Sequence, residues 1–269
     1  MFQNNRRYSI YLKVLLRFFV LYAFLYIYAF PLLYLEIHDL EKLYLKYYYL
    51  YNLLIYIPNI IFIVFSIIYL INNRKEISFI NNKEGIYIQV IVSLIYIYLS
   101  SMLFSPFYHN FNEEIVFEFK YNFRDNIIID IIPVLIVGPI FEEFFFRDYL
   151  LKIFIKDDMV FSGIIITSIL YSLAHFYIAI GNYALDYLPL AEYFILGIVF
   201  ALLRIKNGLI YSMLAHLFYN VIIILFNNKI IDLFFLDYLK SETIFWANYF
   251  LVLFSFITIS YKLFIPPQK

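Results

Sequence analysis

Two adjacent glutamates and an arginine lie close together in a largely apolar stretch of the sequence. The segment GPIFEEFFFRDYL contains the adjacent glutamates Glu142 and Glu143, and Arg147 follows four residues after the second one. Residues four apart share a face of an α-helix, so Glu143 and Arg147 are predicted to form an ion pair. Glu142 is rotated by about 100° from its neighbour, because an α-helix has about 3.6 residues per turn. Its carboxylate is therefore left available for chemistry.

Two of the four histidines also lie inside apolar runs. His175 occurs in ITSILYSLAHFY, four residues after Tyr171, and His216 occurs in GLIYSMLAHLFYN, four residues before Asn220. A carboxylate can act as a base, an imidazole titrates near neutral pH, and a side-chain amide can donate to a developing oxyanion. Together these residue types suit the activation of water and the hydrolysis of an amide bond.

Two other interpretations of the same residues are considered. In the first, Pro139 opens a helix, and the glutamates and the arginine form a cap and ion-pair cluster with no chemistry. In the second, Glu142, Glu192 and the histidines form a proton or cation relay of a small transporter. The sequence lacks the repeated halves with matching interrupted helices that many transporters have, which counts against the relay.

The composition indicates the class of protein that holds these residues. Of the 269 residues, 64% are hydrophobic and only 15% are charged, whereas a soluble domain has about a quarter of its residues charged. Twenty basic residues balance twenty acidic ones, so the chain has no excess of basic residues that would indicate a nucleic-acid partner. The absence of cysteine excludes disulfides, thiolate metal sites and a cysteine nucleophile. We therefore expect an all-α, polytopic membrane bundle.

Apolar runs of about 20 residues, the length needed to cross the hydrocarbon region, predict about eight transmembrane helices. The runs cover residues 18–35, 47–73, 86–108, 127 to the charged cluster at 142, 159–185, 187–203, 207–228 and 243–261. Residues 111–126 are charged and aromatic, which is typical of an interfacial segment. Most Lys and Arg residues fall in segments predicted to lie on the same side of the membrane as the N-terminus. Because Lys and Arg are enriched in cytoplasmic loops, both termini are predicted to be cytoplasmic. No small-residue cleavage site follows the first run, which favours an uncleaved anchor.

The order EExxxR, then aromatic-xxxH, then HxxxN resembles the CPBP (Abi) family of intramembrane proteases. This family includes CAAX prenyl proteases and bacterial bacteriocin-processing or self-immunity proteins, and the resemblance covers roughly residues 127–225. Two residues depart from the family pattern, since Tyr171 stands where Phe is usual and Asp148 follows the arginine where Gly is common. The resemblance divides the chain into N-terminal transmembrane helices with an interfacial segment (1–126), a CPBP-like catalytic core (127–228) and a C-terminal transmembrane helix (229–269).

The resemblance also implies roles for the motif residues. Glu142 is expected to be the general base that draws a proton from water, and His175 to hold and polarise that water. His216 and Asn220 are expected to donate to the carbonyl oxygen as it becomes an oxyanion. Glu143, Arg147 and Tyr171 are expected to support the site structurally.

The need for a metal stays open at this point. The family has been described as metal-dependent, and Glu142, His175 and His216 could bind zinc with an open position for water. The chain lacks HExxH and asparagine is an uncommon zinc ligand, so a site without a cofactor is slightly favoured.

The expected partners are membrane lipid and a peptide or small membrane-associated protein substrate, with no nucleic acid. The expected location is a bacterial cytoplasmic membrane. The alternative within the same family is a non-catalytic immunity or scaffold protein, because a fold does not by itself imply turnover.

Overall fold

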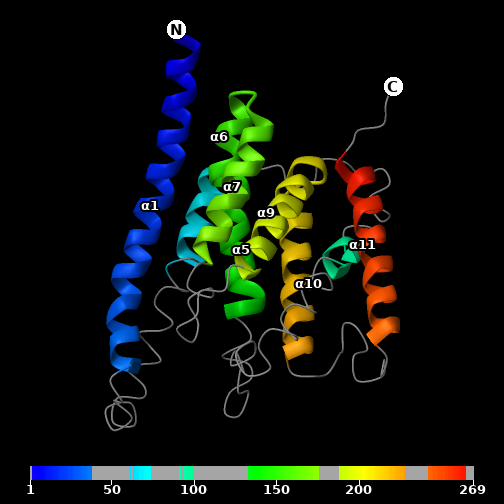
Figure 1. Ribbon diagram of the computed structural model, residues 1–269. Coiled ribbons are helices and arrows are strands. Elements are labelled where there is room, and N and C mark those ends of the chain that lie inside the picture. Colours follow the sequence, from blue (N-terminus) through cyan, green and yellow to red (C-terminus); the bar gives the residue numbers. More distant parts are fainter. Residues whose placement is uncertain are drawn as a thin grey trace.

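The computed structural model describes residues 2–37, 61, 63–73, 91, 94–99, 133–175, 188–227 and 242–264. All regular secondary structure in these ranges is helical, which confirms the predicted all-α class. Figure 1 shows the helices standing side by side, with α1 (Phe2–Ile37) at one edge and α11 (Glu242–Phe264) at the other. The predicted spans 47–73 and 86–108 are described only in part, and the predicted interfacial segment 111–126 lies outside the described residues.

The described helices do not meet the length and hydropathy that a membrane crossing requires. Within the ranges given above, no helix is both long enough and apolar enough to span a membrane. The helical part of the prediction is confirmed, and the assignment of about eight helices to membrane spans stays a prediction.

Helix α1 begins much earlier than the apolar run that predicted it. The run started at residue 18, whereas the helix starts at Phe2 and includes the basic residues that precede the run. Ile10, Val14 and Phe18 recur at every fourth position and are buried, so one stripe of the helix packs against the bundle. The prediction of this boundary was wrong because the basic residues lie beside that stripe and need not interrupt the helix.

The first motif lies on one continuous helical segment in which π-helical and α-helical stretches alternate. It consists of η1 (Pro133–Val137), α5 (Gly138–Glu142), η2 (Glu143–Leu150) and α6 (Leu151–Lys156). The η elements are π-helices, which are rare and occur frequently at functional sites. The predicted apolar run ended at the charged cluster at 142. The observed helix continues past it, because Glu143, Arg147 and Asp148 are buried with partners inside the protein.

Three further helices surround this segment: α7 (Val160–Ala174), α9 (Leu188–Lys206) and α10 (Leu209–Asn227). Helix α7 ends at Ala174, well before the end of the predicted 159–185 run, and residues 176–187 lie outside the described part. The turn between α9 and α10 contains Gly208 with φ of 113°, a conformation that glycine adopts without strain. The turn falls at the break between the predicted runs 187–203 and 207–228 and leads directly into the helix of the third motif.

Two glycines allow neighbouring helices to approach closely. A Cβ atom on Gly197 of α9 would lie 2.9 Å from the Cα of Ser168 on α7. A Cβ atom on Gly163 of α7 would lie 2.6 Å from the Cβ of Phe154 on α6. Helix α7 packs more extensively against α9 than any other pair of elements does in the described part of the chain. Gly197 therefore sets how near the helix of the second motif stands to α9.

The Gly197→Ala substitution tests this close approach. On an open helix surface the change would stabilise the protein by about 1 kcal/mol, because alanine is the better helix former. Here the added methyl meets backbone, so we expect overpacking to cost about 1–3 kcal/mol and to lower the midpoint of thermal unfolding of the detergent-solubilised protein. The exposed Ala191→Val change on the same helix serves as control. A raised midpoint for Gly197→Ala would contradict the close approach.

Candidate active site

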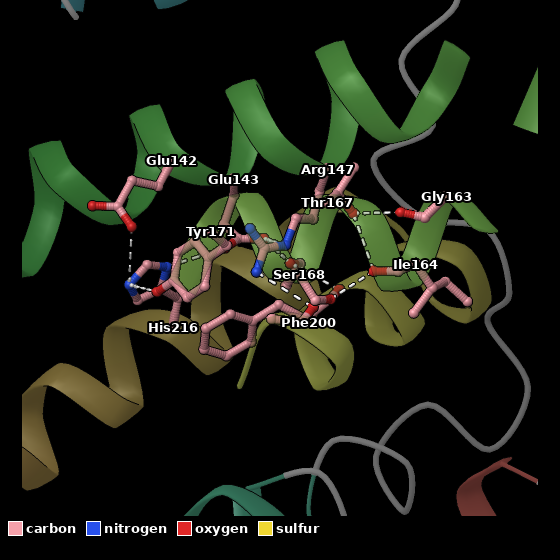
Figure 2. Close-up of polar contacts among 12 residues, drawn as sticks. Glu142, Glu143, Arg147, Gly163, Ile164, Thr167, Ser168, Tyr171, Phe200 and His216 are labelled. Carbon is pink, nitrogen blue, oxygen red and sulfur yellow. Dashed lines mark hydrogen bonds and ion pairs between the residues drawn. The ribbon is translucent and has the colours of Figure 1, made fainter. Parts of the chain in front are cut away.

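The helices bring the three motifs together in the bundle (Figure 2). Glu142 ends α5, Glu143 and Arg147 lie on η2, Tyr171 is on α7, and His216 is on α10. His175 directly follows the last residue of α7, and Asn220 lies on α10 one turn beyond His216. The structure therefore assembles residues from segments that are more than 70 positions apart in the sequence.

Arg147 and Glu143 form the predicted ion pair. The Nε atom of Arg147 lies 3.4 Å from Oε2 of Glu143, and both side chains are fully buried. Arg147 also donates from Nη2 to the carbonyl oxygen of Gly197 on α9, at 3.4 Å. Its Nη1 atom has no hydrogen-bond partner among the described residues. The charge of the arginine is thus balanced by Glu143 rather than by extensive hydrogen bonding.

Three aromatic rings surround the guanidinium group of Arg147. The Cζ atom lies 4.4 Å from the ring centroid of Tyr171, 5.4 Å from that of Phe200 and 5.5 Å from that of Phe146. At these distances a cation is attracted by the ring quadrupole, with an energy of about 2 kcal/mol or more when it is desolvated. This aromatic cage, formed by Phe146, Tyr171 and Phe200, joins the first motif to α7 and α9.

The other contacts of Glu143 were not predicted from the sequence. Ser212 donates its hydroxyl to Oε2 of Glu143, and Oε1 lies 3.1 Å from Nδ1 of His216. From the four-residue spacing, Arg147 was the one predicted partner of Glu143. The sequence feature that could have indicated these contacts is the four-residue spacing of Ser212 and His216, which places both side chains on the same face of α10. Glu143 consequently links the first motif to the third.

The imidazole of His216 is held on every side. The ring stacks on Phe200, with centroids 4.8 Å apart and planes at 15°. Nδ1 faces Glu143, while Nε2 lies 3.3 Å from the hydroxyl of Tyr171 and 3.9 Å from Oε2 of Glu142. Figure 2 shows the Nε2 edge of the ring directed toward the latter two side chains.

His175 approaches the same carboxylate from α7. Its Nδ1 atom lies 2.9 Å from the carbonyl oxygen of Tyr171, and its ring stacks on Tyr193 of α9 with centroids 3.9 Å apart. The Nε2 atom lies 3.8 Å from Oε2 of Glu142. Both histidines therefore present Nε2 to one oxygen of Glu142.

Glu142 is the acceptor at the centre of this arrangement. Its Oε2 atom has no hydrogen-bond partner among the described residues, and both imidazole distances exceed the range of a hydrogen bond. The side chain is 23% exposed, in contrast to the fully buried Glu143. The prediction that one glutamate is neutralised while the other stays available is consistent with this geometry. A carboxylate between two imidazoles can accept a proton from a small polar molecule.

The residues proposed as zinc ligands do not converge as a metal site requires. In the part of the chain that the structure describes, no group of three or more His, Asp or Glu side chains is arranged to hold a metal ion. Glu142, His175 and His216 therefore do not fit zinc as they stand, and we derive no chemical step through a metal.

Two further carboxylates in the apolar helices have partners of their own. Glu192 is buried on α9 and accepts a hydrogen bond of 2.8 Å from the hydroxyl of Tyr219 on α10. Asp148, the departure from the family pattern, is fully buried and paired with Arg204, and it accepts a hydrogen bond of 2.9 Å from Tyr69. No local pattern in the sequence pairs Asp148 with Arg204, because the two residues are 56 positions apart.

Comparison with known proteins supports the interpretation of the motifs. Residues 124–222 match the family model described as type II CAAX prenyl endopeptidase Rce1-like. This match confirms the resemblance to the CAAX prenyl protease family that the motifs predicted. Neither a curated protein nor a solved structure gives a significant match to the chain.

Replacing Arg147 by alanine should leave Glu143 as an uncompensated buried charge. Removal of one partner of a buried pair typically costs about 3–5 kcal/mol, so we expect a large loss of thermal stability. Arg6→Ala is the matched control, because Arg6 pairs with Asp157 at the surface, where ion pairs contribute about 1 kcal/mol or less. Equal midpoints of thermal unfolding for the two variants would show that the buried pair does not stabilise the fold.

Proposed function

We propose that this chain, whose residues 124–222 match the Rce1-like family model of CAAX prenyl endopeptidases, is an intramembrane endopeptidase. Its reaction is the hydrolysis of a peptide bond in a membrane-associated protein or peptide. The observation that carries this proposal is the Oε2 atom of Glu142, which has no hydrogen-bond partner among the described residues and faces Nε2 of His175 and of His216. This is the environment that a general base for water requires.

In the proposed reaction, a water molecule between Glu142 and His175 transfers a proton to Glu142 as its oxygen attacks the carbonyl carbon. The carbonyl oxygen becomes an oxyanion, which Asn220 stabilises through its amide and His216 stabilises when Nε2 carries a proton. The C–N bond then breaks, and the leaving amine takes the proton from Glu142. The proton taken from the water is thus returned to the leaving amine without a cofactor, and the contribution of His216 requires its doubly protonated form.

The remaining motif residues have a supporting role in this proposal. Glu143 holds His216 through Nδ1, and Arg147 balances the charge of Glu143 from within the aromatic cage. Productive geometry is a large part of enzymatic rate enhancement, because a misplacement of about 1 Å can cost about 100-fold. Residues that never contact the substrate therefore remain essential to the rate.

A membrane location is proposed from the family and from the outer surface of the bundle. The Rce1-like family is membrane-embedded. Large apolar side chains are exposed on separate helices, among them Leu12 (68%), Phe161 (78%) and Phe254 (72%). Exposed apolar surface of this kind favours contact with lipid. We propose a bacterial cytoplasmic membrane with membrane lipid as a partner, both termini in the cytoplasm as the distribution of Lys and Arg favours, and no nucleic-acid partner.

The Glu142→Gln substitution tests the proposed base. It keeps the size of the side chain and removes the proton acceptor, so we expect cleavage to fall by about 100-fold to 10,000-fold. The measurement compares small membrane peptides, by mass spectrometry, in cells that express the original chain or the variant. Asp157→Asn, the same chemical change at the surface, should leave the peptide pattern unaltered. Undiminished cleavage by Glu142→Gln would refute the proposed mechanism and favour a non-catalytic member of the family.

The proposed reaction also predicts the response to metal removal. Because Glu142, His175 and His216 do not converge on a metal position, we expect the purified protein to retain its activity after treatment with a chelator. The measurement combines a peptide-cleavage assay with elemental analysis of the same sample. Stoichiometric zinc, with activity lost on chelation and restored by zinc, would replace the proposed mechanism with a metalloprotease one.

A further inference from the structure

Tyr171 contacts both histidines of the candidate site through different atoms. Its main-chain carbonyl oxygen lies 2.9 Å from Nδ1 of His175, and its side-chain hydroxyl lies 3.3 Å from Nε2 of His216. The side chain is fully buried, and its ring also covers the guanidinium group of Arg147. The sequence analysis assigned Tyr171 a supporting role only and gave its hydroxyl no partner.

The partners of the two Nδ1 atoms determine where each imidazole carries its proton. A carbonyl oxygen is only an acceptor, so Nδ1 of His175 must donate to Tyr171. An ionised carboxylate is likewise only an acceptor, so Nδ1 of His216 must donate to Glu143. In a neutral imidazole with its proton on Nδ1, Nε2 is an acceptor. For neutral His216, the only direction left for the contact with Tyr171 is donation from the hydroxyl to Nε2.

We infer that Tyr171 is a positioning residue that fixes the tautomers of both histidines. Its carbonyl oxygen accepts a hydrogen bond from Nδ1 of His175 and so keeps the proton of that imidazole on Nδ1. Its hydroxyl donates to Nε2 of neutral His216, while Glu143 accepts from Nδ1 on the other side of the ring, so the proton of His216 also stays on Nδ1. This inference rests on the proposed function for its consequence in catalysis, but the tautomers themselves are a property of the resting protein.

The tautomers determine what the space beside Glu142 can bind. Oε2 of Glu142 and Nε2 of His175 are both acceptors, and they lie 3.8 Å apart. A water molecule there donates its hydrogens to acceptors and keeps its lone pairs directed away from them. The lone pairs are the part of the water that attacks a carbonyl carbon, so this pattern orients the nucleophile before the substrate arrives. The opposite tautomer of His175 would place an N–H group beside the carboxylate and occupy it.

The hydroxyl of Tyr171 can be removed without removing its ring. The contact with Arg147 uses the ring face, which Tyr171→Phe retains. This variant also retains the main-chain carbonyl that holds His175. Only the hydrogen bond to Nε2 of His216 is lost, so the two histidines should respond differently to the same substitution.

Nitrogen NMR of the full-length protein, labelled with ¹⁵N-histidine in detergent micelles, tests the inference. His175→Gln and His216→Gln variants assign the two signals. In the original chain we expect a protonated Nδ1 and an unprotonated Nε2 for both residues. In Tyr171→Phe, the Nε2 signal of His216 should shift to the position of an acceptor without a hydrogen bond, while that of His175 stays in place. We also expect peptide cleavage to fall by about twofold to tenfold, the range for loss of one hydrogen bond.

The control is Tyr149→Phe, because Tyr149 packs its ring against Phe65, Tyr69 and Phe145 and is not part of the candidate site. It should move neither histidine signal. A proton on Nε2 of either histidine in the original chain, or an unchanged His216 signal in Tyr171→Phe, would overturn the inference. Because the spectrum requires no turnover, these results are independent of the Glu142→Gln test, and an inactive protein with the expected tautomers would refute only the proposed function.

Discussion

The burial of one positive charge governs the arrangement of the other residues in this site. Arg147 lies fully inside the bundle, where a charge is tolerated only with a partner, and Glu143 is that partner. Balancing the arginine keeps Glu143 ionised, and an ionised Glu143 can accept hydrogen bonds from Nδ1 of His216 and from the hydroxyl of Ser212. The orientation of His216 therefore depends on a charge that it does not contact directly. Neither glutamate is redundant, since one balances the arginine and the other faces the histidines.

The aromatic residues have a clearer role than their abundance suggests. They make up 23% of the sequence, and several of those that the structure describes pack against other rings, as Tyr96 does against Phe256. Phe146, Tyr171 and Phe200 are different, because they surround Arg147, and Phe200 also stacks on His216. Tyr193 stacks on His175 in the same way. Flat rings thus hold both imidazoles in fixed planes while leaving their nitrogen atoms to the polar partners.

The sequence predicted a contact within one helix better than it predicted the helix boundaries. Four-residue spacings anticipated the pair of Glu143 with Arg147, because side chains four apart meet on a helix regardless of what surrounds them. The start of α1 was missed, because hydropathy alone treats any charge as the end of a helix. Contacts between distant segments were also missed. The pairing of Asp148 with Arg204 and the stacking of Tyr193 on His175 depend on how α7, α9 and η2 pack, which no local spacing records.

The π-helical turns of η2 have a consequence for how this chain can change over time. A π-helix holds about one residue more per turn than an α-helix of the same length, and here it runs from Glu143 to Leu150. A π-helical turn closes on the residue five positions back, whereas an α-helical turn closes on the residue four positions back. Loss of one residue between Glu143 and Arg147 can therefore be absorbed by a change from π-helix to α-helix, and the two side chains, then three positions apart, still share a face. This stretch should therefore tolerate a change of one residue in length that a regular α-helix would convert into a rotation of every side chain that follows.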